Sequence, residues 1–428
     1  MTIRLVNPTL RWALFGFALL VFLGVSYAAG MVWYADILAN SPKFSDWQRA
    51  AQIEPGNGDY WFRLGINRQL DLENNDTRQA IAYLRKATEL NPRSADYWME
   101  LAAAYESAGE LSQARDAYQR AVREYPSSSE VHWRYGSFLI RQSETPQGYK
   151  EIHGALGITP QLVPLAISRV WRATQNVDDL LTQVLPDNQT AQGQALDFFC
   201  SQNQIDPATA VWDRMVASGR RIPLQTVFPL IDQLLAAVRG DDARRLWREA
   251  VLASGSPDEV TQGDSLVFNG GFEFDIANGG LDWHLQALKG VTYGYETASQ
   301  HSGKRALRVG FDGTQNFNFT GLWQNIPVEP NTKYHFEGYL RTGGITTDSG
   351  PRFVIAFAGG RQPEILLENF TGDRRWELQT ADFTTAADVH LVQIMVTRQP
   401  SQRYDNKMAG FVWVDDVSLV PTGGNPVP

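Results

Sequence analysis

One carboxylate stands between two phenylalanines. In the stretch LVFNGGFEF (266–274), Glu273 lies between Phe272 and Phe274. We expect both rings to face the core, where burying the carboxylate alone would be costly and a bound cation would neutralise it. Exposure to solvent, or an ion pair with an arginine such as Arg305, would explain it equally well. The sequence leaves these three explanations open.

A second acidic pair, Asp415 and Asp416, lies in WVDDVSL (413–419). A glycosidase needs two carboxylates about 5–10 Å apart in a cleft. Successive side chains of a strand point to opposite faces, so these two cannot form such a pair without a bulge. The sequence also lacks nucleophile-elbow, metalloprotease, P-loop and dinucleotide-binding motifs. We therefore expect no catalytic residues, no enzymatic activity and no organic cofactor.

Length and charge narrow the class of protein. A chain of 428 residues is typical of two or three domains. The net charge is −9 without a block of like charges. Because binding to nucleic acid calls for a basic stripe, we expect no nucleic-acid partner.

An uncharged apolar segment, residues 12–35, lies near the N-terminus. As a helix it extends about 36 Å, enough for a hydrocarbon core of about 30 Å. Arg4 and Arg11 precede it, and aromatic residues lie at its two ends: Trp12 at the first, Trp33 and Tyr34 at the second. This pattern predicts a single-pass protein of the inner (cytoplasmic) membrane, with residues 1–11 in the cytoplasm and the bulk in the periplasm or another extracytoplasmic space. The alternative is a signal peptide cleaved near Ala28, which would give a secreted protein.

Two segments repeat each other at a spacing near 34 residues. The repeated positions are Trp61, Leu64, Gly65, Ala80 and Pro92 in the first unit, and Trp98, Leu101, Tyr105, Ala114, Tyr118, Ala121 and Pro126 in the second. This pattern resembles the tetratricopeptide repeat. The first unit departs from it, with Arg68 at the signature tyrosine and three extra residues near 73–75. The resemblance implies helix pairs in which alanines permit close approach, large residues fill gaps and prolines end the second helices.

Weaker copies of the pattern surround these units. A partial unit precedes them at Trp47, Ala50 and Pro55, and a degraded one follows from Trp133 to Pro160. Further echoes occur at 208–212 and 243–250, which extends the predicted α-solenoid over 40–253. Because stacked repeats form a concave surface, we favour binding of a protein partner over a spacer role. The sequence does not identify that partner.

The hydrophobic period changes after a predicted linker at 254–263. From 264 to 421 short apolar stretches alternate with polar residues and are separated by Gly- and Asp-rich turns. This pattern predicts an antiparallel β-sandwich or jelly roll, followed by a disordered tail at 422–428. The predicted fold class is therefore multidomain α + β: a transmembrane helix, an α-solenoid and a C-terminal sandwich.

Several stretches of this segment carry a second resemblance. NGGFE (269–273), HSGKRALRV (301–309), LWQNIPVEPNTKYHFEGYLR (322–341) and WVDDVSL follow one another in this order. Together they resemble the carbohydrate-binding modules of the galactose-binding-like jelly-roll type. The resemblance implies a structural calcium ion held by carboxylates and by backbone oxygens of the 302–304 turn. The implied ligands are Glu273, Ser302, Lys304, Asp415 and Asp416.

The same resemblance implies a glycan site of aromatic and hydrogen-bonding side chains on the concave sheet. The candidates on outward strand positions are Trp323, Tyr339, Arg341, Gln393 and Trp413. Trp283 and Trp376 correspond to framework positions, so we expect both in the core. The sequence thus predicts a non-enzymatic, membrane-anchored adaptor that binds a protein and a polysaccharide, in bacterial polysaccharide assembly, export or cell-surface organisation. The alternative is a structural subunit of a membrane complex whose jelly roll contacts protein and binds no sugar.

Overall fold

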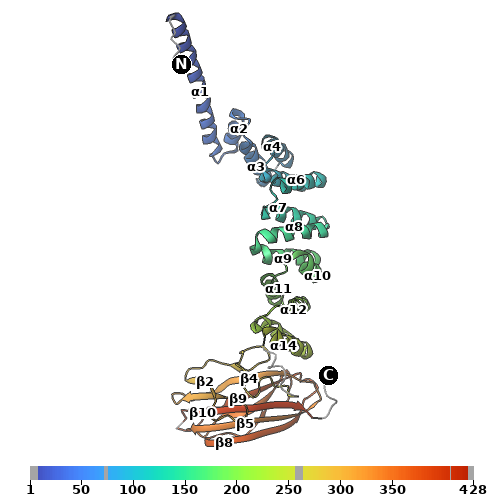
Figure 1. Cartoon of the computed structure of the whole chain (residues 1–428), viewed down its shortest axis with the longest axis vertical. Coiled ribbons are helices and arrows are strands. Elements are labelled where there is room, and N and C mark those ends of the chain that lie inside the picture. The colour runs from blue at the N-terminus through green and yellow to red at the C-terminus, as the bar shows by residue number, and fades with distance from the viewer. Residues whose placement is uncertain (1–7, 72–75, 256–263, 405, 423–428) are drawn as a thin grey trace. The chain divides into compact units, whose positions relative to one another are not determined.

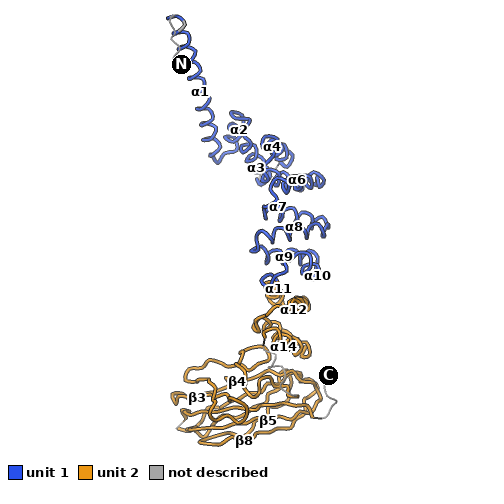
Figure 2. The backbone as a smooth tube through the Cα atoms, viewed as in Figure 1, with its two compact units in different colours: residues 1–191 blue, residues 192–428 orange. Residues whose placement is uncertain are grey.

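The computed structural model describes residues 8–71, 76–255, 264–404 and 406–422. Helices fill the N-terminal part of these residues and antiparallel strands the C-terminal part, which confirms the predicted α + β class (Figure 1). Two compact units divide the chain, Met1–Ala191 and Gln192–Pro428 (Figure 2). The second unit contains the last helices together with the strands.

Some predictions concern residues that the structure does not describe. They are the insertion near 73–75, most of the linker at 254–263, and the tail beyond 422. The predicted domain boundaries stay a prediction.

Helix α1 (Pro8–Ala39) contains the predicted apolar segment. Its portion Arg11–Ala39 is long and apolar enough to cross a membrane, and no residue of its most apolar stretch is buried. Large side chains such as Trp12 and Phe22 are exposed. Such a helix suits a membrane anchor or a signal sequence by length and composition.

The last turns of α1 belong to the repeat array. They form one core with α2 (Phe44–Ile53) and α3 (Gly58–Leu70). The Tyr60 hydroxyl donates to Asp36 Oδ1 at 2.7 Å, and the Tyr97 hydroxyl of the next repeat donates in the same way to Asp59. The end of α1 therefore takes the place of the first helix of a repeat, and α2 takes the place of its second helix.

Three helix pairs follow. They are α3 with α4 (Thr77–Leu90), α5 (Ala95–Ser107) with α6 (Leu111–Glu124), and α7 (Ser129–Arg141) with α8 (Thr145–Ile158). The signature residues Ala80, Ala114 and Ala121 are fully buried. A Cβ at Gly65 would lie 2.5 Å from Leu84 Cγ, so close helix packing requires a glycine there.

The signature tryptophans connect each repeat to the preceding one through a hydrogen bond. The Trp61 indole donates to the Pro55 carbonyl at 3.0 Å, and the Trp98 indole to the Pro92 carbonyl at 2.9 Å. In the third pair His132 Nε2 lies 2.9 Å from the Pro126 carbonyl. His132 therefore occupies the place that the sequence pattern assigned to its neighbour Trp133. The Trp133 side chain does not make the hydrogen bond with the preceding proline that Trp61 and Trp98 make.

The remaining helices are shorter and less regular. The first unit contains η1 (Pro160–Leu162), α9 (Val163–Thr174), α10 (Val177–Asp179) and the π-helical η2 (Leu180–Val184). Helix α11 (Gln189–Ser201) spans the boundary of the units, and α12 (Ile205–Ala217), η3 (Leu224–Val227), α13 (Phe228–Ala236) and α14 (Gly240–Ser254) follow. The echo residues Ala208, Trp212 and Ala243 are fully buried.

Ten strands among the described residues form two antiparallel sheets. They are β1 (His284–Leu285), β2 (Val291–Glu296), β3 (Ala306–Asp312), β4 (Phe319–Pro327), β5 (Lys333–Ile345), β6 (Arg352–Ala358), β7 (Ile365–Leu366), β8 (Gly372–Thr384), β9 (Leu391–Arg398) and β10 (Ala409–Pro421). The order in sheet A is β1-β4-β9-β6-β7, and in sheet B it is β2-β3-β10-β5-β8. A single apolar core lies between the sheets. Along β5, Tyr334, Phe336 and Leu340 point into this core, as predicted from their alternation.

Within the second unit, the last helices pack against loops of the sandwich. Trp247 of α14 meets Phe268 edge to face, with ring centroids 5.3 Å apart. A Cβ at Gly280 would lie 2.3 Å from Trp247 Cζ3, so the loop approaches the indole as closely as a glycine permits. Arg244 donates to the Pro327 carbonyl at 2.8 Å and lies 3.2 Å from the Glu329 carboxylate.

Candidate functional site

The five predicted glycan-binding residues lie on two different outer faces of the sandwich. Trp323 of β4 and Gln393 of β9 belong to sheet A. Tyr339 and Arg341 of β5 and Trp413 of β10 belong to sheet B. None of the five belongs to the core between the sheets. The structure therefore divides the predicted set into two groups that cannot touch one ligand together.

The sheet A group lines an open groove of 520 Å³. Its walls are Asn278, His284, Leu285, Gln286, Thr320, Trp323, Gln393 and Met395. Because β1 pairs with β4 in register, His284 lies opposite Trp323, and their rings stack at 5.0 Å with an angle of 8°. Gln393 donates from Nε2 to Asn325 Oδ1 at 3.0 Å on the neighbouring strand. The groove thus combines an aromatic wall with amide and hydroxyl groups.

The electrostatic character of this groove is neutral. Its lining residues include no carboxylate. Burial lowers the pKa of His284 below its ordinary value, so the imidazole is uncharged at neutral pH. A neutral groove with an aromatic wall suits a neutral ligand with C–H faces and hydroxyl groups, and it holds no acid–base pair of the kind that a glycosidase needs.

The sheet B group is covered by neighbouring side chains. His301 stacks on Tyr339 with ring centroids 3.6 Å apart. The Arg341 guanidinium lies over the Trp413 ring at 4.6 Å, and Trp413 is only 9% exposed. Stacking alone does not separate the two groups, because Trp323 also has a ring partner in His284. Sheet A is the better candidate because Trp323 and Gln393 line an open groove, whereas Trp413 is nearly buried.

Two framework tryptophans behave differently from each other. Trp283 is fully buried in the core, as predicted, and its indole donates to the Asn269 carbonyl at 3.1 Å. Trp376 is only half-buried and lies outside the core, so this prediction was wrong. Its indole donates to the Ser299 carbonyl at 3.0 Å, because β8 is an edge strand and Trp376 faces the neighbouring 299–301 loop.

Asp415 and Asp416 do not point to opposite faces, contrary to the expectation for a regular strand. The register of β10 against β5 shifts between Asp415 and Ser418, and Asp416 has a φ of 47°. Both carboxylates reach the same turn: His301 N–H donates to Asp415 Oδ2 at 2.9 Å, and Ser302 Oγ donates to Asp416 Oδ1 at 2.7 Å. A bulge therefore brings the two side chains together.

Glu273 lies at the same turn and is half-exposed. Its carboxylate accepts the Lys304 N–H at 2.7 Å, while the Arg305 guanidinium donates to the Phe272 carbonyl and pairs with Asp275. Phe272 is in the core, but Phe274 is only partly buried and outside it, which corrects the expectation that both rings face inward. Glu273 is thus held by a backbone amide of the 302–304 turn.

The predicted calcium ligands can be tested against this geometry. Asp415 is fully buried, and backbone N–H groups of His301, Ser302 and Asp416 occupy its oxygens. Burial and the charge of Asp416 raise its pKa to about 6. Glu273 and Asp416 flank Gly271, where a Cβ would lie 3.8 Å from atoms of both. No cluster of three or more acidic, His or Cys side chains that could hold a metal occurs among the described residues. The oxygens of Asp416 also have partners, since Ser302 Oγ donates to Oδ1 and His301 Nδ1 lies 2.6 Å from Oδ2. The calcium ligands stay a prediction, and a cation held by Glu273 and Asp416 would have to replace these partners of Asp416.

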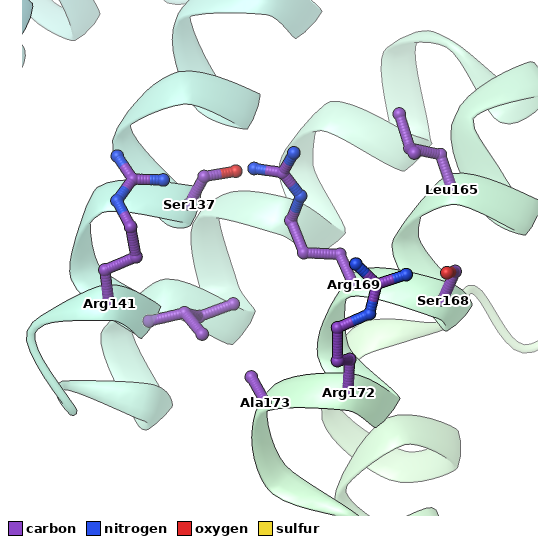
Figure 3. A pocket seen from close by; sticks show the side chains of 8 residues that line it. Ser137, Arg141, Leu165, Ser168, Arg169, Arg172 and Ala173 are labelled. Atoms are coloured by element: carbon purple, nitrogen blue, oxygen red, sulfur yellow. The ribbon is translucent and has the colours of Figure 1, made fainter.

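The first helices of successive repeats line a second surface in the first unit. A hollow of 540 Å³ opens over α7 and α9, and Figure 3 shows Arg141, Ser137, Arg169 and Arg172 around it. A smaller hollow of 210 Å³ adjoins it through shared lining residues and reaches α5. Trp133, which His132 displaced from the signature place, lines the smaller hollow beneath Arg169, whose guanidinium lies 5.1 Å from the ring centroid. We call these two hollows the arginine groove.

Sequence reasoning missed several of these residues. His284 and Met395 line the sheet A groove, but only the pairing of β1 and β9 with β4 places them beside Trp323. His284 follows the buried Trp283, so strand parity could have placed it outward. The larger hollow of the arginine groove gave no signal, because its residues come from α7 and α9, where the repeat signature is lost.

Comparison with known proteins gives one family match. Residues 69–129 match the family described as tetratricopeptide repeat. No curated protein matches the sequence significantly.

Similar solved structures cover parts of the chain. MamA protein is 17% identical over 41% of this chain and 94% of its own, with a TM-score of 0.32. TmCBM61 in complex with β-1,4-galactotriose is 16% identical over 37% of this chain and 99% of its own, with a TM-score of 0.27. The enzymatically active domain of bacteriophage CBA120 tailspike protein 4 is 14% identical over 37% of this chain, with a TM-score of 0.27. The present chain spans only 22% of that tailspike chain. At these identities and TM-scores the likenesses carry no inference about function.

The two resemblances noted in the sequence agree with the fold. Paired helices surround the matched segment, and the C-terminal region is a two-layer antiparallel sandwich. Residues 69–129 are tetratricopeptide repeat, and they lie within an N-terminal region of TPR-like helix pairs.

Proposed function

We propose that this chain is a non-enzymatic adaptor held at a membrane by α1, whose solenoid binds a protein partner and whose sandwich binds a glycan. Helix α1 would leave residues 1–11 in the cytoplasm and the remainder on the other side, because basic residues precede the apolar segment. In a bacterium this layout suits polysaccharide assembly or export at the inner membrane, or organisation of the cell surface.

The sheet A groove is the observation that carries the glycan proposal. A pyranose ring presents a C–H face that packs on an indole, and hydroxyl groups that pair with amides and hydroxyls. Trp323, Gln393 and Thr320 supply these groups on one open surface of the sandwich. The volume of 520 Å³ is sufficient for a short oligosaccharide.

We expect Trp323→Ala to weaken glycan binding by about tenfold or more, because it removes the stacking surface. The measurement is a glycan array probed with the full chain in detergent, as wild type and as this variant. Trp413→Ala is the matched control, since it removes an indole from the other outer face. The proposal fails if no glycan is bound, or if the Trp413 variant loses binding while the Trp323 variant retains it.

The second candidate is a structural subunit whose sandwich contacts protein and binds no sugar. The contact of Trp247 with Phe268 favours it, because the sandwich already uses one end as a protein-binding surface. This candidate predicts an empty glycan array for wild type, together with crosslinks from the sheet A face to another protein.

We further propose that a structural calcium ion binds beside Gly271, with Glu273 and Asp416 as side-chain ligands. Two carboxylates are few for calcium, which takes six to eight oxygens, so backbone carbonyls and water would supply the rest. The ion would offset the repulsion between Asp416 and the buried Asp415 and fasten β10 to the 302–304 turn.

Calcium is expected to raise the melting temperature of the wild-type sandwich by about 5 °C or more relative to a chelator. Glu273→Gln should remove most of this increase, because it deletes one of two charged ligands. Glu364→Gln removes an exposed carboxylate elsewhere in the sandwich and should leave the increase unchanged. Differential scanning fluorimetry of the full chain in detergent measures the effect. Equal melting curves with calcium and with chelator would exclude the ion.

A further inference from the structure

The arginine groove concentrates positive charge in an acidic protein. The chain has a net charge of −9, yet Arg141, Arg169 and Arg172 project around one hollow (Figure 3). Arg141 pairs with Glu106 through two bonds of 2.8 and 2.9 Å. For Arg169 and Arg172, no carboxylate within the described part of the chain lies within ion-pair distance. Two guanidinium groups thus face the groove without a counter-ion.

A buried hydroxyl in the same place lacks a partner. Ser137 is only 4% exposed, lines both hollows, and its Oγ has no hydrogen-bond partner within the structure. Figure 3 places this hydroxyl between Arg141 and Arg169. A buried polar atom without a partner costs free energy, so the groove contains a donor that a ligand could satisfy.

Desolvation and like charge act together at Arg169. Its partial burial and the charges of Arg141 and Arg172 lower its pKa. An anion in the groove would relieve this repulsion, which is the electrostatic complementarity that selects one class of partner over another.

We propose that the arginine groove binds an acidic segment of a partner protein, with its carboxylates on Arg169 and Arg172 and an oxygen on the Ser137 hydroxyl. This inference rests on the proposed function of the solenoid as a protein-binding module and adds the chemistry of the partner. Guanidinium groups pair with carboxylates through two parallel bonds, which gives both affinity and orientation.

The apolar part of the lining selects a peptide over an anionic sugar polymer. Ile140, Leu165 and Ala173 line the hollow beside the arginines, and Leu165 is 48% exposed. A segment that alternates acidic and apolar side chains satisfies both kinds of surface. A uronate polymer carries the charge but has few groups for the apolar walls.

Fluorescence anisotropy tests the proposal with the full chain in nanodiscs. The probe is a labelled peptide of about twelve residues that alternates Glu and Leu, and the comparison peptide has Gln in place of Glu. We expect the acidic peptide to bind at least about tenfold more tightly, with an affinity that falls as salt rises.

Paired variants locate the binding site. Arg169→Gln combined with Arg172→Gln should weaken binding of the acidic peptide by about tenfold or more. Arg78→Gln combined with Arg93→Gln removes the same charge from exposed positions outside the groove and should change it less than about twofold. Ser137→Ala should weaken binding by about two- to fivefold without lowering the melting temperature, because no bond within the chain is lost.

Three results would overturn the proposal. They are no binding of the acidic peptide, equal losses in the two double variants, or tighter binding of an oligogalacturonate that the groove variant abolishes. If the Gln peptide binds as tightly as the acidic one and Trp133→Ala abolishes both, the solenoid still binds protein, but the acidic specificity is wrong.

Discussion

Replacing Trp247 with alanine is expected to lower the stability of the contact between α14 and the sandwich by about 3–5 kcal/mol. Trp247 is 4% exposed and packs between Phe228 and Phe268, against Gly280. No smaller side chain can fill this space without moving the loop. We expect α14 to move relative to the sandwich in the variant, because the packing contact that holds them together in the wild type is lost.

Native-state hydrogen exchange measures this effect for each segment separately. Amides of α13 and α14 should exchange faster in the variant, while those of β5 and β10 should change little, because the sandwich has a core of its own. Leu252→Ala on the same helix removes a side chain that is 50% exposed and should leave exchange unaltered. Uniform acceleration across the sandwich would contradict this account, because Trp247 would then support the sandwich itself.

Replacing Arg398 with methionine is expected to cost about 3–5 kcal/mol of sandwich stability. Arg398 is fully buried at the end of β9, and burial lowers its pKa. Its guanidinium donates to the carbonyls of Phe317 and Ser349 and to Asn316 Oδ1. Without it the buried Phe317 carbonyl and the part-buried acceptors of Asn316 and Ser349 lose their donor, so the β3–β4 and β5–β6 loops lose a shared contact.

Arg403 provides the control for this second prediction. Its side chain is 76% exposed and pairs with Asp348 at 2.9 Å, so Arg403→Met should cost less than about 1 kcal/mol. The measurement is the melting temperature of the full chain in detergent, followed by near-ultraviolet circular dichroism. Equal effects of the two substitutions would show that the buried bonds of Arg398 contribute nothing beyond a surface ion pair.

The sequence predicted those features that depend on local spacing. Alanines, tryptophans and prolines at repeat positions identified helix pairs, because tight helix packing requires small residues at fixed intervals. Alternation along 334–341 identified which side chains of β5 leave the core. The repeat spacing and the strand alternation each involve residues within a few helical turns or within one strand, so both can be recognised in the sequence.

Features that depend on contacts between residues far apart in the sequence could not be predicted from it. Strand parity showed that Trp323 and Trp413 point outward, but not that β4 and β10 belong to different sheets. The bulge at Asp415 and Asp416 needs a left-handed residue, and an aspartate gives a weaker signal for it than a glycine. The one-residue offset that places His132 under Pro126 and frees Trp133 depends on how the third repeat packs.

We propose that the sheet A groove recognises a glycan, and hydroxyl-radical footprinting of the groove residues measures this binding site by site. Trp323 and Met395 line the groove and oxidise readily, while Trp376 and Phe411 on sheet B report on the other face. The full chain in nanodiscs is oxidised with and without a pool of β-linked oligosaccharides. We expect the sugars to protect Trp323 and Met395 from oxidation and to leave the oxidation of Trp376 and Phe411 unchanged. Protection of the sheet B residues alone, or of none, would contradict this proposal.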